Sequence, residues 1–283
     1  MSAESQASLF EPEPVTLPAS VGPAAVRAIE TTHLLTPGKG RISDYDFTLN
    51  PYRGCSFGCS YCFAAFFVAD DLQRAEWGKW VEVKVRAAEA LRHRNLRGKR
   101  IFMSSATDPY QPLEAKLELT REIVAILGDA QARLVVQTRS PLAARDVDLF
   151  KRFQFLRVNM SVTTDDDSVR KQFEPGCASI ERRLEAVERI KAAGVRVAVC
   201  VCPMLPMHDP EAFGKRLTRM GVDAVTSGYF HSGDRAFAAG TRDRARELAD
   251  EQGWTYEAYS RCRAALRHGC EAYGSSGAAF GPV

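Results

Sequence analysis

Short apolar runs alternate with longer stretches of helical periodicity along most of this chain. A short apolar run predicts a buried strand, and apolar residues repeated every three or four positions predict a helix. Glycine ends four of the predicted helices, and a Ser-Pro or Asp-Pro pair starts two of them. The predicted strands are 47–49, 100–105, 134–138, 156–163, 195–201 and 222–226, and the predicted helices are 82–96, 117–127, a stretch after Ser140, 179–193, 209–220 and 235–251.

Six strand–helix units in series, joined by short connections, predict an α/β fold with a parallel sheet. A full barrel needs eight such units, so six predict an open, partial (β/α)6 barrel of the TIM type. The units occupy residues 46–252. Residues 1–45, rich in Pro, Ala, Ser and Glu, predict a flexible tail and an irregular lead-in. Residues 253–283 lose the pattern and predict a C-terminal cap or lid.

The chain has 283 residues, of which 45% are hydrophobic and 26% are charged, enough for one large domain. A formal charge of +3 and a pI of about 8.4 permit a polyanionic partner without requiring one. No apolar run approaches the length of a membrane span, and the first residues lack the pattern of a secretory signal. Because three of eight cysteines share one loop, we expect a reducing compartment, the cytoplasm. The oligomeric state does not follow from these features.

Three cysteines, Cys55, Cys59 and Cys62, stand four and then three positions apart in one tight loop. Gly54 and Gly58 permit close backbone turns, so the three thiolates can converge. Thiolates suit iron–sulfur clusters, zinc and copper(I). A cubane 4Fe-4S cluster usually takes four cysteines, so three indicate an iron left open for another ligand. A zinc knuckle, for which no fourth ligand is nearby, and plain structural thiols are the alternatives.

The Cys-x3-Cys-x2-Cys spacing, with the aromatic residue Tyr61 before the last cysteine, resembles the signature of the radical S-adenosylmethionine (SAM) superfamily. The resemblance implies a 4Fe-4S cluster bound by Cys55, Cys59 and Cys62, whose open iron chelates the amino and carboxylate groups of SAM. It also implies reductive cleavage of SAM to a 5′-deoxyadenosyl radical. An electron donor of the flavodoxin or ferredoxin type is the expected partner.

Polar residues follow three predicted strands at their carboxyl ends, where ligands bind in parallel α/β folds. Asp108, after the second strand, suits the ammonium group of SAM, and Arg139, after the third, suits its carboxylate by bidentate pairing. Each residue also has a structural alternative, such as an Asx-turn at Asp108 or a helix cap at Ser140.

Further motifs are similar to the spore photoproduct lyase-like branch of that superfamily, from about residue 44 to residue 206. By that resemblance Thr107, Asp108, Arg139 and Ser161 contact SAM. Tyr61 would lie against the adenine. The motifs are Asn-Pro-Tyr-Arg-Gly-Cys at 50–55, Thr-Asp at 107–108, Thr-Arg-Ser at 138–140, Ser-Val-Thr-Thr at 161–164, Phe-Glu-Pro at 173–175, Arg-Leu at 183–184 and Ala-Gly-Val at 193–195.

Two positions depart from that branch. Ser105 stands where the lyase has the cysteine that returns a hydrogen atom, and Phe63 stands where it has a tyrosine of its radical relay. A replacement hydrogen donor is Cys202, which period two places on one strand face with Cys200, while valines occupy the other face. The alternative is that Cys202 is buried as a small hydrophobe.

Basic side chains crowd residues 84–100 and predict either a face that contacts phosphates or a solvated helix face. The residues expected on that face are Arg86, His93, Arg97 and Arg100. After the sixth strand Tyr229, a candidate catalytic residue, stands with His231 and Arg235 where they can stack on a base or pack as core. Cys262 and Cys270 are too few to bind a metal and are expected to be structural.

The sequence therefore predicts a radical SAM enzyme that abstracts hydrogen from its substrate. By analogy the substrate is a pyrimidine lesion in a nucleic acid. Two alternatives remain, a radical SAM enzyme that acts on a small molecule or peptide, and a non-catalytic iron–sulfur or zinc protein that binds nucleic acid.

Overall fold

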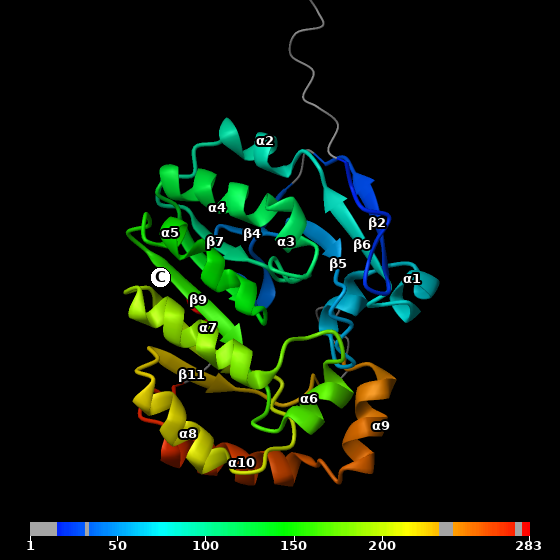
Figure 1. The fold of residues 1–283 in the computed structure, drawn as a ribbon, viewed down its shortest axis with the longest axis vertical. Helices are drawn as coiled ribbons and strands as arrows, with labels where there is room; N and C mark the ends of the chain where they lie inside the picture. The colour runs from blue at the N-terminus through cyan, green and yellow to red at the C-terminus, as the bar shows by residue number, and fades with distance from the viewer. Residues whose placement is uncertain (1–15, 32–33, 232–239, 275–278) are drawn as a thin grey trace, which may run out of the picture.

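The computed structural model describes residues 16–31, 34–231, 240–274 and 279–283, and a seven-stranded sheet of order β11-β10-β9-β8-β7-β4-β3 forms its centre (Figure 1). From β4 to β11 all neighbours are parallel, and β3 pairs antiparallel with β4. The strands are β3 (Leu35–Pro37), β4 (Phe47–Leu49), β7 (Arg100–Met103), β8 (Arg133–Thr138), β9 (Leu156–Ser161), β10 (Arg196–Val201) and β11 (Ala224–Ser227). The six predicted strands are present, with ends that differ by at most two residues, and the partial barrel is confirmed.

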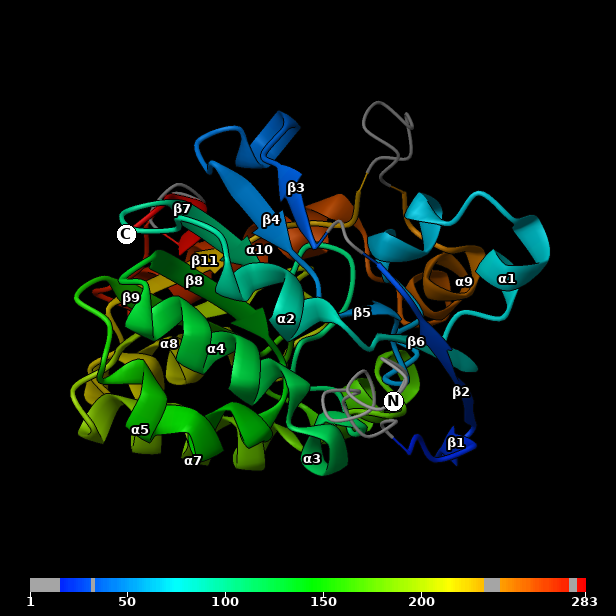
Figure 2. The ribbon, with the colours of Figure 1, turned by 90° about the horizontal axis from the view of Figure 1, so that it is seen from above.

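Helices cover the outer face of this sheet (Figure 2). Their apolar side chains pack with the valines of β10 in the main core. Ser179 and Asp209 cap the helices that follow them, because each side chain accepts a hydrogen bond from a backbone N–H of the first turn. The elements are α2 (Ala87–Arg92), α3 (Glu114–Leu117), α4 (Leu119–Asp129), α5 (Val147–Phe150), α7 (Ile180–Ala192), α8 (Pro210–Arg219) and the 3-10 helix η3 (Pro141–Asp146), which takes the place of the helix predicted after Ser140.

The inner face of the sheet carries smaller and polar side chains. Ala198 and Cys200 of β10 pack with Ala279, which confirms the predicted division of β10 into a valine face and a small-residue face. Arg157 and Asn159 of β9 donate hydrogen bonds to the carbonyl oxygen of Ala279. The last described segment therefore closes the inner face near the starting ends of the strands, and Figure 1 marks the C-terminus beside the start of β9.

A second sheet, of order β1-β2-β6-β5, is absent from the predicted elements. Part of the expected lead-in thus forms strands, and the helix predicted for 82–96 begins only at Ala87. Val81 and Val83 are buried, and their strand lies between two partner strands, so pairing with segments remote in sequence overrides the helical pattern. The strands are β1 (Ser20–Val21), β2 (Ala24–Ile29), β5 (Tyr52–Gly54) and β6 (Trp80–Lys84).

Within residues 253–283, for which the sequence predicts a cap or lid, the structure describes a helix and a residue that pairs with β11. The helix α10 (Tyr256–Gly269) packs against α8, and Tyr273 pairs in parallel with Val225 of β11. The part of the helix predicted for 235–251 that precedes residue 240 lies outside the described residues. The other helical segments are η1 (Gly40–Ile42), η2 (Phe63–Phe67), α1 (Asp71–Ala75), α6 (Asp167–Phe173) and α9 (Asp243–Glu251). Among the described ranges no helix combines the length and the apolar character needed to cross a lipid bilayer.

Candidate active site at the cysteine loop

The cysteine loop (residues 55–62) lies at the carboxyl edge of the large sheet, where the parallel strands end. Residues that follow β7 form hydrogen bonds to the first residues of this loop. Thr107 Oγ1 donates to the carbonyl oxygen of Gly54 at 2.6 Å, and Gln111 Oε1 accepts from the backbone N–H of Ser56 at 3.0 Å. The polar residues after β7 thus position the loop.

The turn after α6 holds the other side of the loop. The backbone N–H of Ser60 donates to the carbonyl oxygen of Phe173 at 2.8 Å, and that of Gly176 donates to the carbonyl oxygen of Phe57 at 3.2 Å. A Cβ at Gly176 would lie 2.7 Å from that same oxygen, so no larger residue fits here. The loop is clamped between two segments that the sheet brings together.

The three predicted ligands on the loop are buried or half-buried. Burial, with a contribution from the neighbouring thiols, raises the pKa of Cys55 well above its ordinary value and that of Cys62 to about 11. A cubane takes each thiolate on a different iron, so its ligands surround it instead of meeting at one point. The donor set fits a 4Fe-4S cluster.

Glu174 lies at the centre of a buried polar network beside the loop. Its carboxylate accepts hydrogen bonds from Tyr61 and from Thr163, the latter at 2.7 Å. It also forms ion pairs with Arg139, at 3.0 Å, and with Arg183. Burial disfavours the charged carboxylate, but the two guanidinium groups outweigh burial and lower the pKa of Glu174 to about 2. Glu174 therefore holds the guanidinium groups of Arg139 and Arg183 beside the loop.

The carboxylate of Asp108 accepts three hydrogen bonds from neighbouring protein groups. The donors are Thr138 Oγ1 at 2.7 Å, the backbone N–H of Arg139 at 2.8 Å and that of Tyr110 at 2.9 Å. Burial raises the pKa of Asp108 despite these donors. The turn expected as its structural alternative is thus present. An ionised carboxylate offers about four acceptor positions, so one is left for a ligand.

The other predicted SAM contacts belong to the same region. The guanidinium of Arg139 lies 5.4 Å from the centre of the Tyr61 ring, and it also contacts the Tyr61 hydroxyl. Ser161 Oγ accepts from Gln137 Nε2 at 2.9 Å. With Thr107 and Asp108, these residues line the carboxyl edge beside the cysteine loop.

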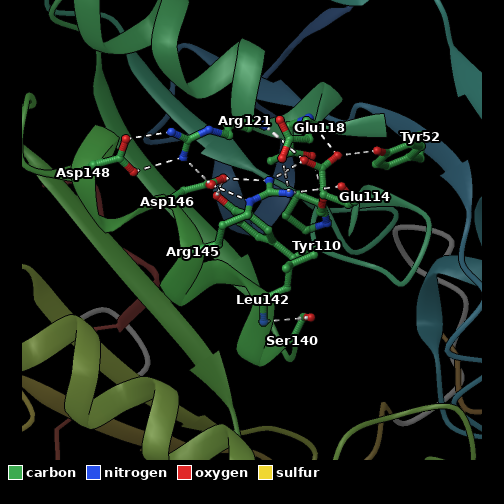
Figure 3. A network of polar contacts seen from close by, with 12 residues as sticks. Tyr52, Tyr110, Glu114, Glu118, Arg121, Ser140, Leu142, Arg145, Asp146 and Asp148 are labelled. Carbon is green, nitrogen blue, oxygen red and sulfur yellow. Dashed lines mark hydrogen bonds and ion pairs between the residues drawn. The ribbon is translucent and has the colours of Figure 1, made fainter. Parts of the chain in front are cut away.

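A second buried network anchors β5, the strand that leads into the loop (Figure 3). Tyr52 donates to the carboxylate of Glu114, which also accepts from the backbone N–H of Thr120 at 2.9 Å. Glu114 pairs with Arg145 at 2.8 Å, and Arg145 pairs in turn with Asp146 at 2.7 Å. This network gives a structural reason for the tyrosine of the Asn-Pro-Tyr-Arg-Gly-Cys motif, which stands three positions before the first cysteine.

Cys202 and Tyr229, the predicted catalytic residues, both follow strands that end at this edge. Cys202 is half-buried, and its Sγ lies 3.9 Å from the carbonyl oxygen of Thr226. The hydroxyl of Tyr229 donates to the carbonyl oxygen of Trp254 at 3.2 Å, and its ring packs on Tyr259. Both residues thus lie at the edge that carries the site. Among the described residues neither makes a hydrogen bond to the cysteine loop, and Tyr229 also packs against the main core.

The two positions that depart from the lyase-like branch have structural partners. The backbone N–H of Ser105 donates to Asn50 Oδ1 at 3.0 Å, and Asn50 Nδ2 donates back to Ser105 Oγ at 3.4 Å. Phe63 packs edge-to-face on His231, with ring centres 5.1 Å apart. Arg235, grouped with His231 in the sequence, lies outside the described residues.

Within the basic segment 84–100, Lys84 lines a cavity with Gly54 and Ala106 beside the cysteine loop, whereas Arg100 stands at the starting end of β7. The helix ends at Arg92. The prediction that His93, Arg97 and Arg100 share a helical face with Arg86 is therefore wrong. Several cations of the segment pair with acids instead. The pairs are Arg86–Glu89, Arg92–Glu122 and Arg100–Asp46.

Two site residues carry roles that the sequence did not assign. Glu174 is visible in the Phe-Glu-Pro motif, but its partners come from remote segments. Cys177 follows that motif, and its Sγ lies 3.6 Å from Sγ of Cys59. The contact with Cys177 lowers the pKa of Cys59. Cys270 is buried in the main core, and Cys262 packs against that core, in keeping with the structural role expected of both.

Fold and site together define a partial (β/α)6 barrel with a three-thiolate cluster loop at its carboxyl edge. Residues 49–220 match the family model described as "Radical SAM superfamily", and the chain belongs to that superfamily. An uncharacterised protein of Methanocaldococcus jannaschii is 32% identical over 166 residues, which cover 59% of this chain and 63% of that protein.

Two further comparisons carry functional names. A "Radical SAM Nalpha-GlyT isomerase" of Pseudomonas phage M6 is 22% identical over 191 residues, which cover 65% of this chain and 39% of the isomerase. A structure of spore photoproduct lyase complexed with dinucleoside spore photoproduct aligns with a TM-score of 0.59 and 14% identity, over 88% of this chain and 81% of the lyase. At that identity the likeness concerns the fold.

Proposed function

We propose that this chain is a radical SAM enzyme that binds a 4Fe-4S cluster through Cys55, Cys59 and Cys62 and abstracts hydrogen from a substrate. The observation that carries the proposal is the loop of three buried or half-buried thiols beside the guanidinium of Arg139, at the edge where parallel α/β folds bind ligands. When cluster and SAM are bound, they supply a 5′-deoxyadenosyl radical. A flavodoxin- or ferredoxin-type protein is the proposed electron donor.

The residues of the network have distinct proposed tasks. Arg139 binds the carboxylate of SAM, because its side-chain contacts with Tyr61 and Glu174 use one of its three nitrogen atoms. Asp108 offers its remaining acceptor position to the ammonium group. Tyr61 faces the adenine, and Thr107 and Ser161 complete the polar wall.

Anaerobic reconstitution tests this proposal. Wild-type protein should take up about four iron atoms per chain, and with dithionite and SAM it should release 5′-deoxyadenosine, measured by chromatography. Cys55→Ala should lose both properties. Cys270→Ala should keep both, because Cys270 packs in the main core. A colourless wild-type protein that binds zinc through the same thiols would contradict the proposal and support a non-catalytic metal protein.

We propose a modified pyrimidine in a nucleic acid as the substrate class. The fold likeness to a lyase solved with a dinucleoside photoproduct supports it. The alternative, a small molecule or peptide, is favoured by the pairing of three cations of the basic segment with acids, which leaves fewer of them for phosphates. A lesion-bearing dinucleotide that stimulates 5′-deoxyadenosine release, together with DNA binding that weakens steeply with salt, would separate the two. Salt-insensitive or absent DNA binding would favour the small molecule or peptide.

A further inference from the structure

A fourth cysteine, Cys177, touches one of the proposed cluster ligands. The sulfur atoms of Cys59 and Cys177 are 3.6 Å apart, and the two residues are 4% and 7% exposed. They are 118 positions apart in the chain, so the fold alone creates this contact. All eight cysteines lie in the described residues, and no other pair of them makes a comparable contact there.

The backbone on both sides of the pair is fixed. Next to Cys59, the N–H of Ser60 donates to Phe173, and next to Cys177, the N–H of Gly176 donates to Phe57. The carbonyl oxygen of Cys177 itself accepts from Arg170 Nη1 at 2.8 Å. The two thiols are therefore held against each other by the same contacts that clamp the cysteine loop.

We propose that Cys59 and Cys177 form a reversible disulfide in the cluster-free chain and are an oxidative modification site. The inference rests on the proposed function, in which Cys59 is a cluster ligand. A disulfide needs a sulfur–sulfur distance of about 2.05 Å, so the two sulfur atoms must approach by about 1.5 Å from the observed 3.6 Å. A cluster requires thiolates, so the disulfide removes one of its three protein ligands.

The oxidant is hydrogen peroxide, which is small enough to reach thiols of such low exposure. One thiolate attacks a peroxide oxygen, the O–O bond breaks, and a sulfenic acid and a hydroxide form; the hydroxide takes a proton from solvent and leaves as the first water. The second thiol then attacks the sulfenic sulfur, the S–S bond forms, and a second water leaves. Two sulfur atoms are oxidised by two electrons in total, and the peroxide is reduced to two waters. A dithiol reverses the bond by exchange.

The experiment uses the full-length, cluster-free chain, reduced and then treated with hydrogen peroxide. We expect the loss of two free thiols and, after proteolysis and fragmentation, a cross-link between Cys59 and Cys177. Iron uptake in reconstitution without a reductant should then be mostly lost, and dithiothreitol should restore it.

Two variants make the result specific. In Cys177→Ala the thiol of Cys59 should stay free under the same treatment, and the variant should keep its iron uptake. Cys200→Ala, which removes a buried cysteine of the inner sheet face, should respond like the wild type. Cys177→Ser, which keeps a small polar side chain, should repeat the result of Cys177→Ala if the alanine variant folds poorly.

The outcomes are separable from those of the proposed function. A cross-link that joins other cysteines, or none, overturns the inference even when reduced protein binds iron normally. Equal loss of iron uptake in Cys177→Ala overturns it as well. Failure of reduced wild-type protein to bind iron, with the Cys59–Cys177 cross-link present, refutes the proposed function and leaves the modification site in place.

Discussion

At the scale of single residues, the charge of Glu174 organises the polar side of the site. Its side chain is fully buried and pairs with Arg183, whose side chain is equally buried. A buried ion pair is stable only when both charges have close partners. Removal of one partner leaves the other charge buried and unpaired, which strongly destabilises the fold. Glu174 thus fixes the positions of Arg139 and Tyr61, and its charge also balances that of Arg183.

We expect Glu174→Gln to lower the free energy of unfolding by about 3–5 kcal/mol, because Arg183 would remain buried without a counter-charge. Urea unfolding of the cluster-free chain measures this. The matched control is Glu181→Gln, which breaks an exposed pair with Arg216 and should cost about 0–1 kcal/mol. Similar losses in the two variants would show that Glu174 does not carry the energetic role assigned to it.

The stability contributed by Glu174 should depend on pH in the acid range. Its pKa is about 2 in the folded chain, against an ordinary value of 4.5. The depressed pKa means that this contribution is complete above pH 4.5 and is lost as the pH falls from 4.5 toward 2. The difference in unfolding free energy between wild type and Glu174→Gln should therefore shrink in this window. A difference that stays constant there would contradict the ionised state of Glu174.

At the scale of elements, the turn after α6 determines where the cysteine loop lies. Gly176 and the backbone of Phe173 meet the loop directly, without intervening side chains. The helix α6 itself is absent from the predicted elements because it is only seven residues long, and its sequence carries little periodicity. Longer helices such as α7 and α8, with a capping residue and a repeated apolar face, were predictable.

Gly176→Ala should weaken cluster binding. The added Cβ would lie 2.7 Å from the carbonyl oxygen of Phe57 and 2.9 Å from that of Ser56, so the backbone of the loop must move. We expect a loss of about 1–3 kcal/mol, as in overpacked cores, together with a lower iron content after reconstitution. Gly98→Ala, where a Cβ meets nothing within 4 Å but the φ of +70° strains alanine, should cost stability and leave the iron content unchanged. Normal iron content in Gly176→Ala would show that the loop tolerates the shift.

At the scale of the whole molecule, the C-terminal segment completes the inner face of the sheet. Arg157 and Asn159 are buried and donate to Ala279, and the hydroxyl of Tyr45 donates to the carbonyl oxygen of Phe280 at 2.8 Å. The polar floor of the barrel is thus satisfied by the end of the same chain, while the opposite, carboxyl edge carries the site.

Deletion of residues 279–283 should destabilise the barrel, because buried donors on β9 would lose their acceptors. We expect about 1–3 kcal/mol for each unsatisfied group, measured by chemical unfolding. Arg157→Met should cost stability in the full chain but little in the truncated one, since its partners are then already gone. Additive losses would show that Arg157 and the segment act independently.

The sequence by itself determined the six strands of the barrel, the capped helices, the small-residue face of β10 and the three cysteines on one loop. These features are local, since each depends on residues within one run or one turn. Only the tertiary structure decided that Glu174 lies between two arginines, that Cys177 touches Cys59, that the N-terminal residues pair with β6, and that the last residues fill the barrel floor. Each of these contacts joins segments that approach one another only once the sheet has formed, and no spacing along the chain encodes that approach.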